Sequence, residues 1–418
     1  MNKSALYKNA RDVYASYGVN TDLAIKKLAA VQISLHCWQG DDVAGTEEAS
    51  GALSGGIMAT GNYPGRARNG DELRADADFA LKLAPGKHRM NIHAKYAETN
   101  GRPVERNELK LEHFCRWIDW AKRKGLALDF NPTFFSHPKA ASGFTLSSAD
   151  EGIRNFWIEH ALSSRKIAAG MGKTLKKTAI NNLWIPDGYK DEPADRKSPR
   201  ERLKKSLDRI YALKLPKRDI LDAVEGKLFG LGSESYVTGS YDFYLSYAAK
   251  NGLLPTLDMG HFHPTESVAD KISSLLANLD AVLVHISRGV RWDSDHVAVL
   301  NDELVSLARE IVRGGYTERV YLALDYFDAS VNRVAAWVVG LRAARKALLC
   351  ALLEPRSKLT AYEAAGNFTA RLALSEESKT LPAGQVWDEF CRRNNVPEGM
   401  DWLKEVEAYE KSVLSKRR

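Results

Sequence analysis

The stretch Thr256-Leu257-Asp258-Met259-Gly260-His261-Phe262-His263-Pro264 is the one around which the rest of the chain is organised. In it a short apolar run ends in a carboxylate, and a histidine follows three residues later. Similar runs end at Glu225, His285 and Asp325. A carboxylate at the end of a buried strand is costly unless a positive charge pairs with it. The repeated pattern therefore predicts a shared cation, and its oxygen and imidazole ligands suit Mn, Mg, Co or Zn.

Outward from this stretch, short apolar segments alternate with helical patterns along the chain. The predicted strands span residues 31–38, 90–94, 126–131, 182–185, 220–224, 253–257, 281–285 and 320–324. This alternation is typical of a (β/α)8 TIM barrel, an α/β fold whose chemistry lies at the carboxyl ends of the strands. The side chains expected on that rim are His36, His93, Asn131, Trp184, Glu225, Asp258, His285 and Asp325. The apolar strands alone do not identify an enzyme, because buried parallel strands look alike in any barrel.

Helical segments complete the predicted organisation. Ser148 with Glu151 forms a capping box, which predicts a helix that runs to about residue 169. Beyond the last strand the pattern is purely helical, over residues 331–353, 358–376, 384–394 and 401–416. We therefore expect residues 1–330 to form the barrel and catalytic domain. We expect residues 331–418 to form a C-terminal helical extension that packs on the barrel or another subunit and takes part in oligomerisation.

Composition narrows the function classes. The chain has 418 residues with 44% hydrophobic and 27% charged residues, as in an ordinary globular protein. Its net charge of +7 is spread along the chain, and the basic tail 411–418 lacks the interleaved aromatic residues of a nucleic-acid groove. No apolar run approaches the about 18 residues of a membrane span. The scattered cysteines and an N-terminus without an apolar leader favour a cytoplasmic protein that binds neither membranes nor nucleic acid.

Two residue pairs near the central stretch have the spacing of ligands on an extended segment. His261 with His263, and Asp293 with Asp295, are two residues apart, which places each pair on one side of a strand. His261 lies close enough to Asp258 for one strand end to serve two adjacent sites. The alternative is that Asp293 and Asp295 cap a helix expected at 296–313.

Several segments together resemble the L-rhamnose isomerase family, and the resemblance covers essentially the whole chain. They are His36-Cys37-Trp38-Gln39-Gly40-Asp41-Asp42, Gly61-Asn62-Tyr63-Pro64-Gly65, Trp184-Ile185-Pro186-Asp187-Gly188, Glu225-Gly226-Lys227-Leu228-Phe229-Gly230, Gly260-His261-Phe262-His263-Pro264-Thr265-Glu266 and Arg291-Trp292-Asp293-Ser294-Asp295-His296. Gly226 stands where serine is common in the family, a change beside the ligands that we expect to be tolerated.

The resemblance implies a homotetrameric, cytoplasmic, Mn2+-dependent isomerase that converts the aldose L-rhamnose to the ketose L-rhamnulose, in a fold related to the xylose isomerases. Co2+, Mg2+ or Zn2+ are expected to substitute in one or two sites per subunit. By position, a structural metal site is implied at Glu225, Asp258, His285 and Asp325. A catalytic metal site is implied at His261, Asp293 and Asp295. Catalytic or sugar-contacting roles are implied for Lys227, His93 and Asp325, and apolar walls of the sugar pocket for Trp184 and Phe130.

Both sugar-pocket assignments have plainer alternatives when the residues are taken alone. Lys227 can simply pair with a rim carboxylate, and Trp184 can be part of the core. For the reaction, a cation that contacts both O1 and O2 would favour a hydride shift from C2 to C1. A related isomerase with another preferred aldose remains possible on the sequence. A metal-dependent phosphodiesterase on a similar barrel would need a basic groove, which the sequence does not show. A sugar-binding protein without turnover would have lost ligands.

Overall fold

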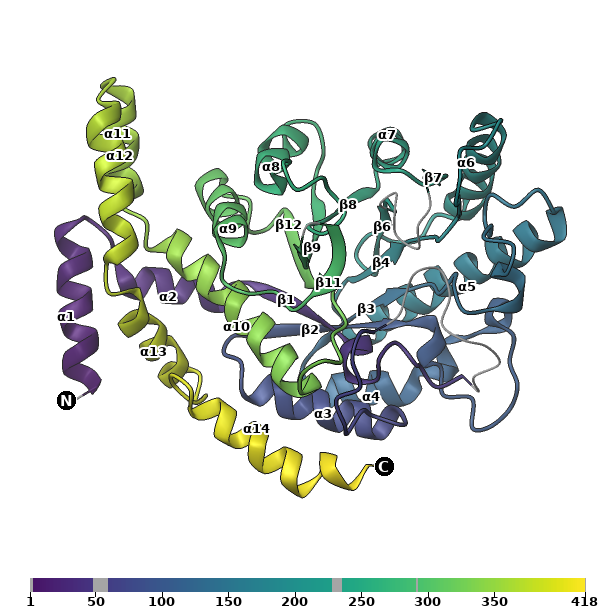
Figure 1. Cartoon of the computed structure of the whole chain (residues 1–418), viewed down its shortest axis with the longest axis horizontal. Coiled ribbons are helices and arrows are strands. Elements are labelled where there is room, and N and C mark those ends of the chain that lie inside the picture. The colour runs from purple at the N-terminus through teal and green to yellow at the C-terminus, as the bar shows by residue number, and fades with distance from the viewer. Residues whose placement is uncertain (1–2, 48–58, 228–234, 291, 418) are drawn as a thin grey trace.

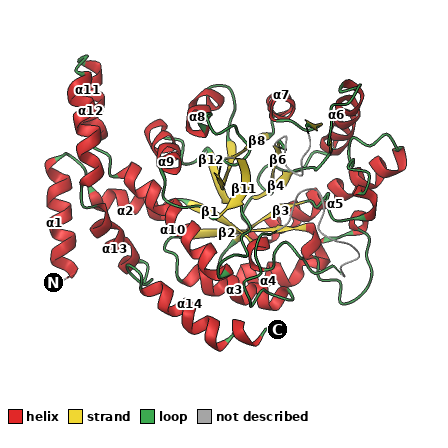
Figure 2. Cartoon of the chain, in the orientation of Figure 1, coloured by secondary structure: helices red, strands yellow, loops and turns green. Residues whose placement is uncertain are grey.

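Parallel strands close into a barrel at the centre of the molecule, and helices surround it (Figures 1 and 2). The structure is a computed structural model that describes residues 3–47, 59–227, 235–290 and 292–417, without the side chains of 292–295. The barrel strands follow one another in chain order, and the last closes on the first. They are β1 (Gln32–His36), β2 (Lys87–His93), β3 (Ala127–Asn131), β4 (Ala179–Leu183), β6 (Ile220–Glu225), β8 (Leu254–Asp258), β9 (Val282–Ile286) and β12 (Val320–Leu324).

A helix follows each barrel strand on the outside, as parallel neighbours require. In order these helices are α3 (Gly70–Lys82), α4 (Cys115–Lys124), α5 (Glu151–Leu175), α6 (Lys197–Ala212), α7 (Tyr241–Asn251), α8 (Val268–Leu276), α9 (Asp302–Gly314) and α10 (Arg333–Leu352). Before the barrel lie α1 (Lys3–Ser16) and α2 (Thr21–Ala30). After it come α11 (Arg356–Ala364), α12 (Phe368–Glu377), α13 (Ala383–Arg393) and α14 (Asp401–Ser412).

Shorter elements shape the loops. Two antiparallel pairs are formed by β5 (Gly188–Tyr189) with β7 (Tyr236–Val237) and by β10 (Arg288–Val290) with β11 (Trp292–His296). The 3-10 turns are η1 (Cys37–Gly40), η2 (Ala94–Tyr96), η3 (Arg106–Glu108), η4 (Leu111–Phe114), η5 (Pro138–Ala140), η7 (Ser378–Thr380) and η8 (Leu414–Lys416). The turn η1 leaves β1 at the same rim as the candidate ligands.

The predicted (β/α)8 barrel and its C-terminal helices are confirmed, with differences at the ends of elements. The strand predicted at 182–185 begins at Ala179, because it pairs with β6 from its first residue. The predicted capping box is wrong. The carboxylate of Asp150 caps α5 by accepting a hydrogen bond from Ile153 N, and Ser148 Oγ accepts one from Asp150 N. The helix predicted at 358–376 is two helices, α11 and α12.

The inside of the barrel divides into an apolar half and a polar half. Alternate residues of β4, β6, β8, β9 and β12 pack inward as an apolar cluster. Across from them, β1, β2 and β3 turn polar groups inward, where Ser34 Oγ and Arg89 bind the carboxylate of Asp129 at 2.6–2.9 Å. Within the polar half, the charges of Arg89 and Asp129 neutralise each other. The candidate ligands lie at the carboxyl-end rim instead.

The C-terminal helices have two different surroundings. The helix α10 packs on α9, α2 and α3 and closes the outer ring, whereas the α11–α12 hairpin projects away from the barrel (Figure 1). The helix α14 returns to the barrel, where Tyr409 stacks on Phe79 of α3 at a ring distance of 4.1 Å. Among the described residues, no helix is long and apolar enough to cross a membrane.

Candidate metal centre

Four side chains meet at the carboxyl-end rim of the barrel. Glu225 and Asp258 are the last residues of β6 and β8, His285 lies in β9, and Asp325 directly follows β12. One ligand atom from each lies within 4.8 Å of the others. Neighbouring parallel strands fix this arrangement, since Asp258 pairs with His285 across the β8–β9 ladder. The structure thus brings together the four residues that the sequence predicts for one site.

The carboxylates of Glu225 and Asp258 are each held through one oxygen. Asn182 Nδ2 donates to Glu225 Oε2 at 2.6 Å, and Asn182 is itself fixed by Thr256 Oγ1. Ser287 Oγ donates to Asp258 Oδ1 at 2.6 Å. In both residues the second oxygen faces His285, at 3.3 Å for Glu225 and 3.6 Å for Asp258. Neutral donors that hold one oxygen while the other faces inward are the arrangement of supported metal ligands.

Asp325 follows the same pattern from a different part of the chain. Trp38 Nε1 donates to Asp325 Oδ1 at 3.0 Å, while Asp325 Oδ2 lies 2.9 Å from His285 Nδ1. Neither ring nitrogen of the fully buried His285 makes a hydrogen bond of acceptable geometry. The Nδ1 atom of His285 thus faces three carboxylate oxygens without a well-formed hydrogen bond to any of them. This is the environment expected of a nitrogen that binds a metal.

The pKa values in the cluster indicate that its three carboxylates lack sufficient positive charge. Burial opposes the charged form of His285, but Glu225 and Asp325 outweigh it and raise the pKa of the imidazole well above its usual value. Burial also raises the pKa of Asp325, which His285 only partly offsets. For Asp258, burial is outweighed by His261, His285 and the Ser287 hydroxyl, and its pKa is lowered. A proton on His285 therefore takes the place that a cation would fill.

The donor set fits a divalent cation. Three carboxylate oxygens and one imidazole nitrogen are ligands for Mn2+, Mg2+, Co2+ or Zn2+, and no thiol is among them. The fit does not choose among these metals.

The second predicted site lies next to the first but is only partly described. His261 Nδ1 is 3.5 Å from Glu225 Oε1 and 2.9 Å from Gly226 O, so its ring is turned toward the cluster. Its predicted companions Asp293 and Asp295 belong to β11, and their side chains lie outside the described part of the chain. The alternative helix-cap role for them is wrong, because α9 begins at Asp302 and Asn301 caps it.

The predicted sugar contacts gather beside the cluster. Lys227 is buried, donates to Pro186 O at 2.9 Å and lies over the ring of Trp184, 5.9 Å from its centre. His93 lies edge-on to Trp38 at 4.8 Å. The backbone of Gly226 packs closely against that of Tyr241, since a Cβ at Gly226 would come 2.8 Å from the Tyr241 backbone.

Phe130 is not part of this wall. It alternates with the inward-facing Asp129 and Asn131, so its ring points to the helix layer and packs edge-on against Phe114 at 5.0 Å. The ring that lies next to the predicted sugar contacts is Phe135, which the sequence reasoning missed. Phe135 lies edge-on to both His93 and Trp184, at 5.6 and 6.1 Å. The signal that was available is its place just beyond the end of β3.

Comparison with known proteins finds relatives of this chain by sequence and by structure. A family model for L-rhamnose isomerase (RhaA) matches residues 1–417. An L-rhamnose isomerase of Rhodopirellula baltica is 56% identical over 98% of this chain and 96% of its own length. One of Escherichia coli O9:H4 (strain HS) is 52% identical over 98% of this chain and 97% of its own. Among solved structures, a D-allulose 3-epimerase from Methylomonas aligns with a TM-score of 0.48 and 12% identity, over 76% of this chain and 98% of its own.

Proposed function

The chain belongs to the L-rhamnose isomerase family, and on this premise we propose how its rim interconverts L-rhamnose and L-rhamnulose. Glu225, Asp258, His285 and Asp325 would hold a divalent cation, for which we propose Mn2+, with Co2+, Mg2+ or Zn2+ as substitutes. The observation that carries this is that each of the three carboxylates turns one oxygen toward His285 while a neutral donor holds the other.

A second cation site beside the first would serve catalysis. We assign it to His261, Asp293 and Asp295, with Asp258 near enough to contribute. The contact of His261 Nδ1 with the Gly226 carbonyl supports this role, because a ligand histidine needs its other nitrogen fixed.

The sugar would lie between the cluster and the aromatic side chains. We propose that Lys227 and His93 contact oxygens near the reacting carbons and that Asp325 borders the same space. In support, Trp38 contacts both the ring of His93 and the carboxylate of Asp325. Trp184 and Phe135 form an apolar surface that suits the methyl group of a 6-deoxy sugar. The hydrogen bond from Lys227 to Pro186 O fixes where the ammonium group stands.

A divalent cation, when bound, polarises two neighbouring sugar oxygens and stabilises the negative charge that develops on them. Hydrogen then moves from C2 to C1 as hydride, and a proton moves from O2 to O1. A proton-abstraction route would need a free base at C2. Glu225, Asp258 and Asp325 already have one oxygen held and the other turned to the cluster, which favours the shift.

Metal removal tests the cation. After chelation we expect turnover of L-rhamnose to be lost, and Mn2+ to restore it best in a series with Co2+, Mg2+ and Zn2+. The melting temperature should also rise with metal, because the metal binds the folded state. Full activity in metal-free protein would refute the proposal, and a panel of aldoses in the same assay measures the sugar preference.

Isotope transfer tests the hydride shift. With L-rhamnose deuterated at C2 in ordinary water, we expect the label at C1 of the ketose at low conversion. Extensive loss of deuterium to solvent would instead indicate an enediol, with Asp325 or Lys227 as the base.

The C-terminal extension, residues 331–418, is proposed to assemble a homotetramer. Its hairpin helix α12 has no buried residue in the single chain, and Phe368 and Leu372 are 58% and 68% exposed. Deletion of 380–418 should give smaller or insoluble species in sedimentation analysis. A deleted protein that remains a full-size, active tetramer would remove the idea.

We also propose that the enzyme acts in the cytoplasm. Cysteines 37, 115, 350 and 391 are all free thiols, which suits a reducing compartment. Cell fractionation tests this, and recovery in the periplasm would contradict it.

A further inference from the structure

Trp38 touches both halves of the proposed site. It lies in η1, just after β1, and is only 3% exposed. Its indole N–H donates to Asp325 Oδ1 at 3.0 Å, and its ring lies edge-on to His93 with centres 4.8 Å apart. One side chain therefore contacts a proposed metal ligand and a proposed sugar contact, although it is itself neither.

The turn that carries Trp38 is fixed to the segment that carries Asp325. Gln39 Nε2 donates to Asp328 O at 2.8 Å, and Asp328 N donates back to Gln39 Oε1 at 2.8 Å. Gly40 fits tightly under two side chains, since a Cβ there would lie 2.5 Å from Leu73 and 2.6 Å from Trp337. The distance between the indole and the carboxylate is thus set by the backbone on both sides.

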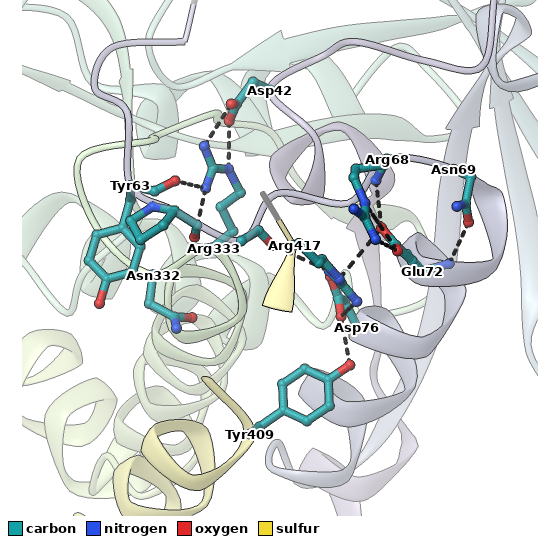
Figure 3. Close-up of polar contacts among 12 residues, drawn as sticks. Asp42, Tyr63, Arg68, Asn69, Glu72, Asp76, Asn332, Arg333, Tyr409 and Arg417 are labelled. Atoms are coloured by element: carbon teal, nitrogen blue, oxygen red, sulfur yellow. Dashed lines mark hydrogen bonds and ion pairs between the residues drawn. The ribbon is translucent and has the colours of Figure 1, made fainter. Parts of the chain in front are cut away.

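Two residues shortly after η1 hold an unfavourable backbone conformation. Asp42 and Val43 have φ of +59° and +60°, which a β-branched residue rarely adopts. Arg333 binds the Asp42 carboxylate at 2.6–2.7 Å, and Lys95 Nζ donates to Val43 O at 2.6 Å (Figure 3 shows the Arg333 contact). Contacts from two other elements hold this turn, which keeps η1 and its indole in place.

We propose that Trp38 is a positioning residue of the isomerase. Its N–H holds Asp325 with one oxygen turned toward the cation. Its ring supports the side of the His93 ring, whose Nδ1 lies 3.2 Å from Thr133 Oγ1. This rests on the proposed function, in which Asp325 is a metal ligand. Asn182 and Ser287 do the same for Glu225 and Asp258, but Trp38 alone among these donors also borders a proposed sugar contact.

Loss of the N–H would leave Asp325 Oδ1 without its donor, so the carboxylate would be free to rotate. Mutation of a donor that orients a metal ligand typically lowers metal affinity or activity by about 10–100-fold. We expect Trp38→Phe to weaken Mn2+ binding and lower kcat by this order, and to raise KM because the smaller ring no longer supports His93.

Replacement of Trp38 by β-(3-benzothienyl)alanine separates the two effects. This residue keeps the size of the indole but has sulfur in place of the N–H. It should weaken Mn2+ binding and lower kcat while KM stays near the wild-type value. The matched control is Trp120→Phe, which breaks another indole–carboxylate hydrogen bond of 3.0 Å, to Asp78 on the outer helices. The control should leave metal affinity and kcat unchanged.

The measurements are calorimetric titration of metal-free protein with Mn2+, the gain in melting temperature with Mn2+, and steady-state kinetics on L-rhamnose. If the wild-type protein binds neither Mn2+ nor Co2+, Mg2+ or Zn2+, the proposed metal site fails. If the wild type binds Mn2+ and the benzothienyl variant binds it equally with the same kcat, only the role of Trp38 fails. Should Trp38→Phe not fold, the benzothienyl variant alone decides the question.

Discussion

Near the C-terminus a buried carboxylate is paired with an arginine, whereas at the barrel rim buried carboxylates converge on an imidazole. The carboxylate of Asp76 in α3 accepts hydrogen bonds from both terminal nitrogens of Arg417, at 2.5 and 2.8 Å. It accepts a third from the hydroxyl of Tyr409 at 2.7 Å (Figure 3). Among the described residues, Glu225 and Asp258 have no arginine or lysine in an ion pair and share the histidine of the cluster. In the first arrangement the chain supplies its own cation, whereas the second could bind a divalent cation.

Two more carboxylates in the barrel strands are also paired with arginine. Asp129 is bound by Arg89, and Asp222 is bound by Arg165 at 2.8–2.9 Å. Asp222 is only three residues before Glu225 on the same strand, yet it faces the helices and Glu225 faces the rim. On β6, the face on which the side chain lies, rather than the residue type, separates the arginine-paired Asp222 from the candidate ligand Glu225.

The largest expected effect comes from neutralising one rim carboxylate. In Asp258→Asn we expect kcat to fall by a factor on the order of 10³ or more, because the amide is a poor metal ligand. In metal-free protein the same change should lower the melting temperature, because it removes the charge that His261 and His285 stabilise and that gives Asp258 its lowered pKa. Calorimetry with and without Mn2+ measures both effects. A variant that keeps the full wild-type gain in melting temperature with Mn2+ would show that Asp258 holds no cation.

In the C-terminal pair, a loss of stability is expected that does not depend on metal. Arg417→Met leaves the buried Asp76 without its cation, which should cost roughly 3 kcal/mol of unfolding free energy. The Asp76→Leu, Arg417→Met double variant should regain much of that loss, because no buried charge is left unpaired. The matched control is Arg371→Met, which breaks an exposed pair with Glu363 and should cost less than about 1 kcal/mol. Equal losses in Arg417→Met and the control, by urea unfolding, would contradict the comparison.

The sequence predicts the strands and the residues at their ends well, because both follow from period and from the barrel rule. Glu225, Asp258, His285 and Asp325 needed only the knowledge that strand ends share a rim. Phe130 was misplaced although the two-residue alternation was available, since its neighbours Asp129 and Asn131 face inward.

The partners that come from loops could not be predicted in this way. Trp38 and Phe135 lie beyond strand ends, where the backbone path depends on turns such as the left-handed pair at 42–43. The prediction that Ser148 caps α5 was wrong for a similar reason. Ser148 and Asp150 both suit an N-cap, and tertiary packing decides between them.

A third kind of buried titratable group gives the smallest effect and sharpens the comparison. His160 of α5 is fully buried and stays neutral, so it needs neither an arginine nor a metal to balance a charge. Its Nδ1 donates to Arg106 O, and its Nε2 accepts from Thr133 N, both at 2.9 Å. Burial lowers the pKa of this imidazole to about 3, with the charge of Arg106 acting in the same direction.

The sign of the pH dependence follows from that direction. The unfolded chain has a histidine pKa near about 6.5, so below that pH the unfolded state binds the proton and the folded state does not. The stability that the folded protein gains from keeping His160 neutral is therefore fully present above about pH 6.5. It is lost progressively as the pH falls toward 3. At pH 5 the loss is about 2 kcal/mol. His160→Gln cannot titrate, so we expect its unfolding free energy to fall less between pH 7 and pH 5 than that of wild type. Urea unfolding at the two pH values measures this, with His113→Gln on the partly exposed η4 as the control. An equal fall in wild type and His160→Gln would mean that His160 is already protonated in the folded protein.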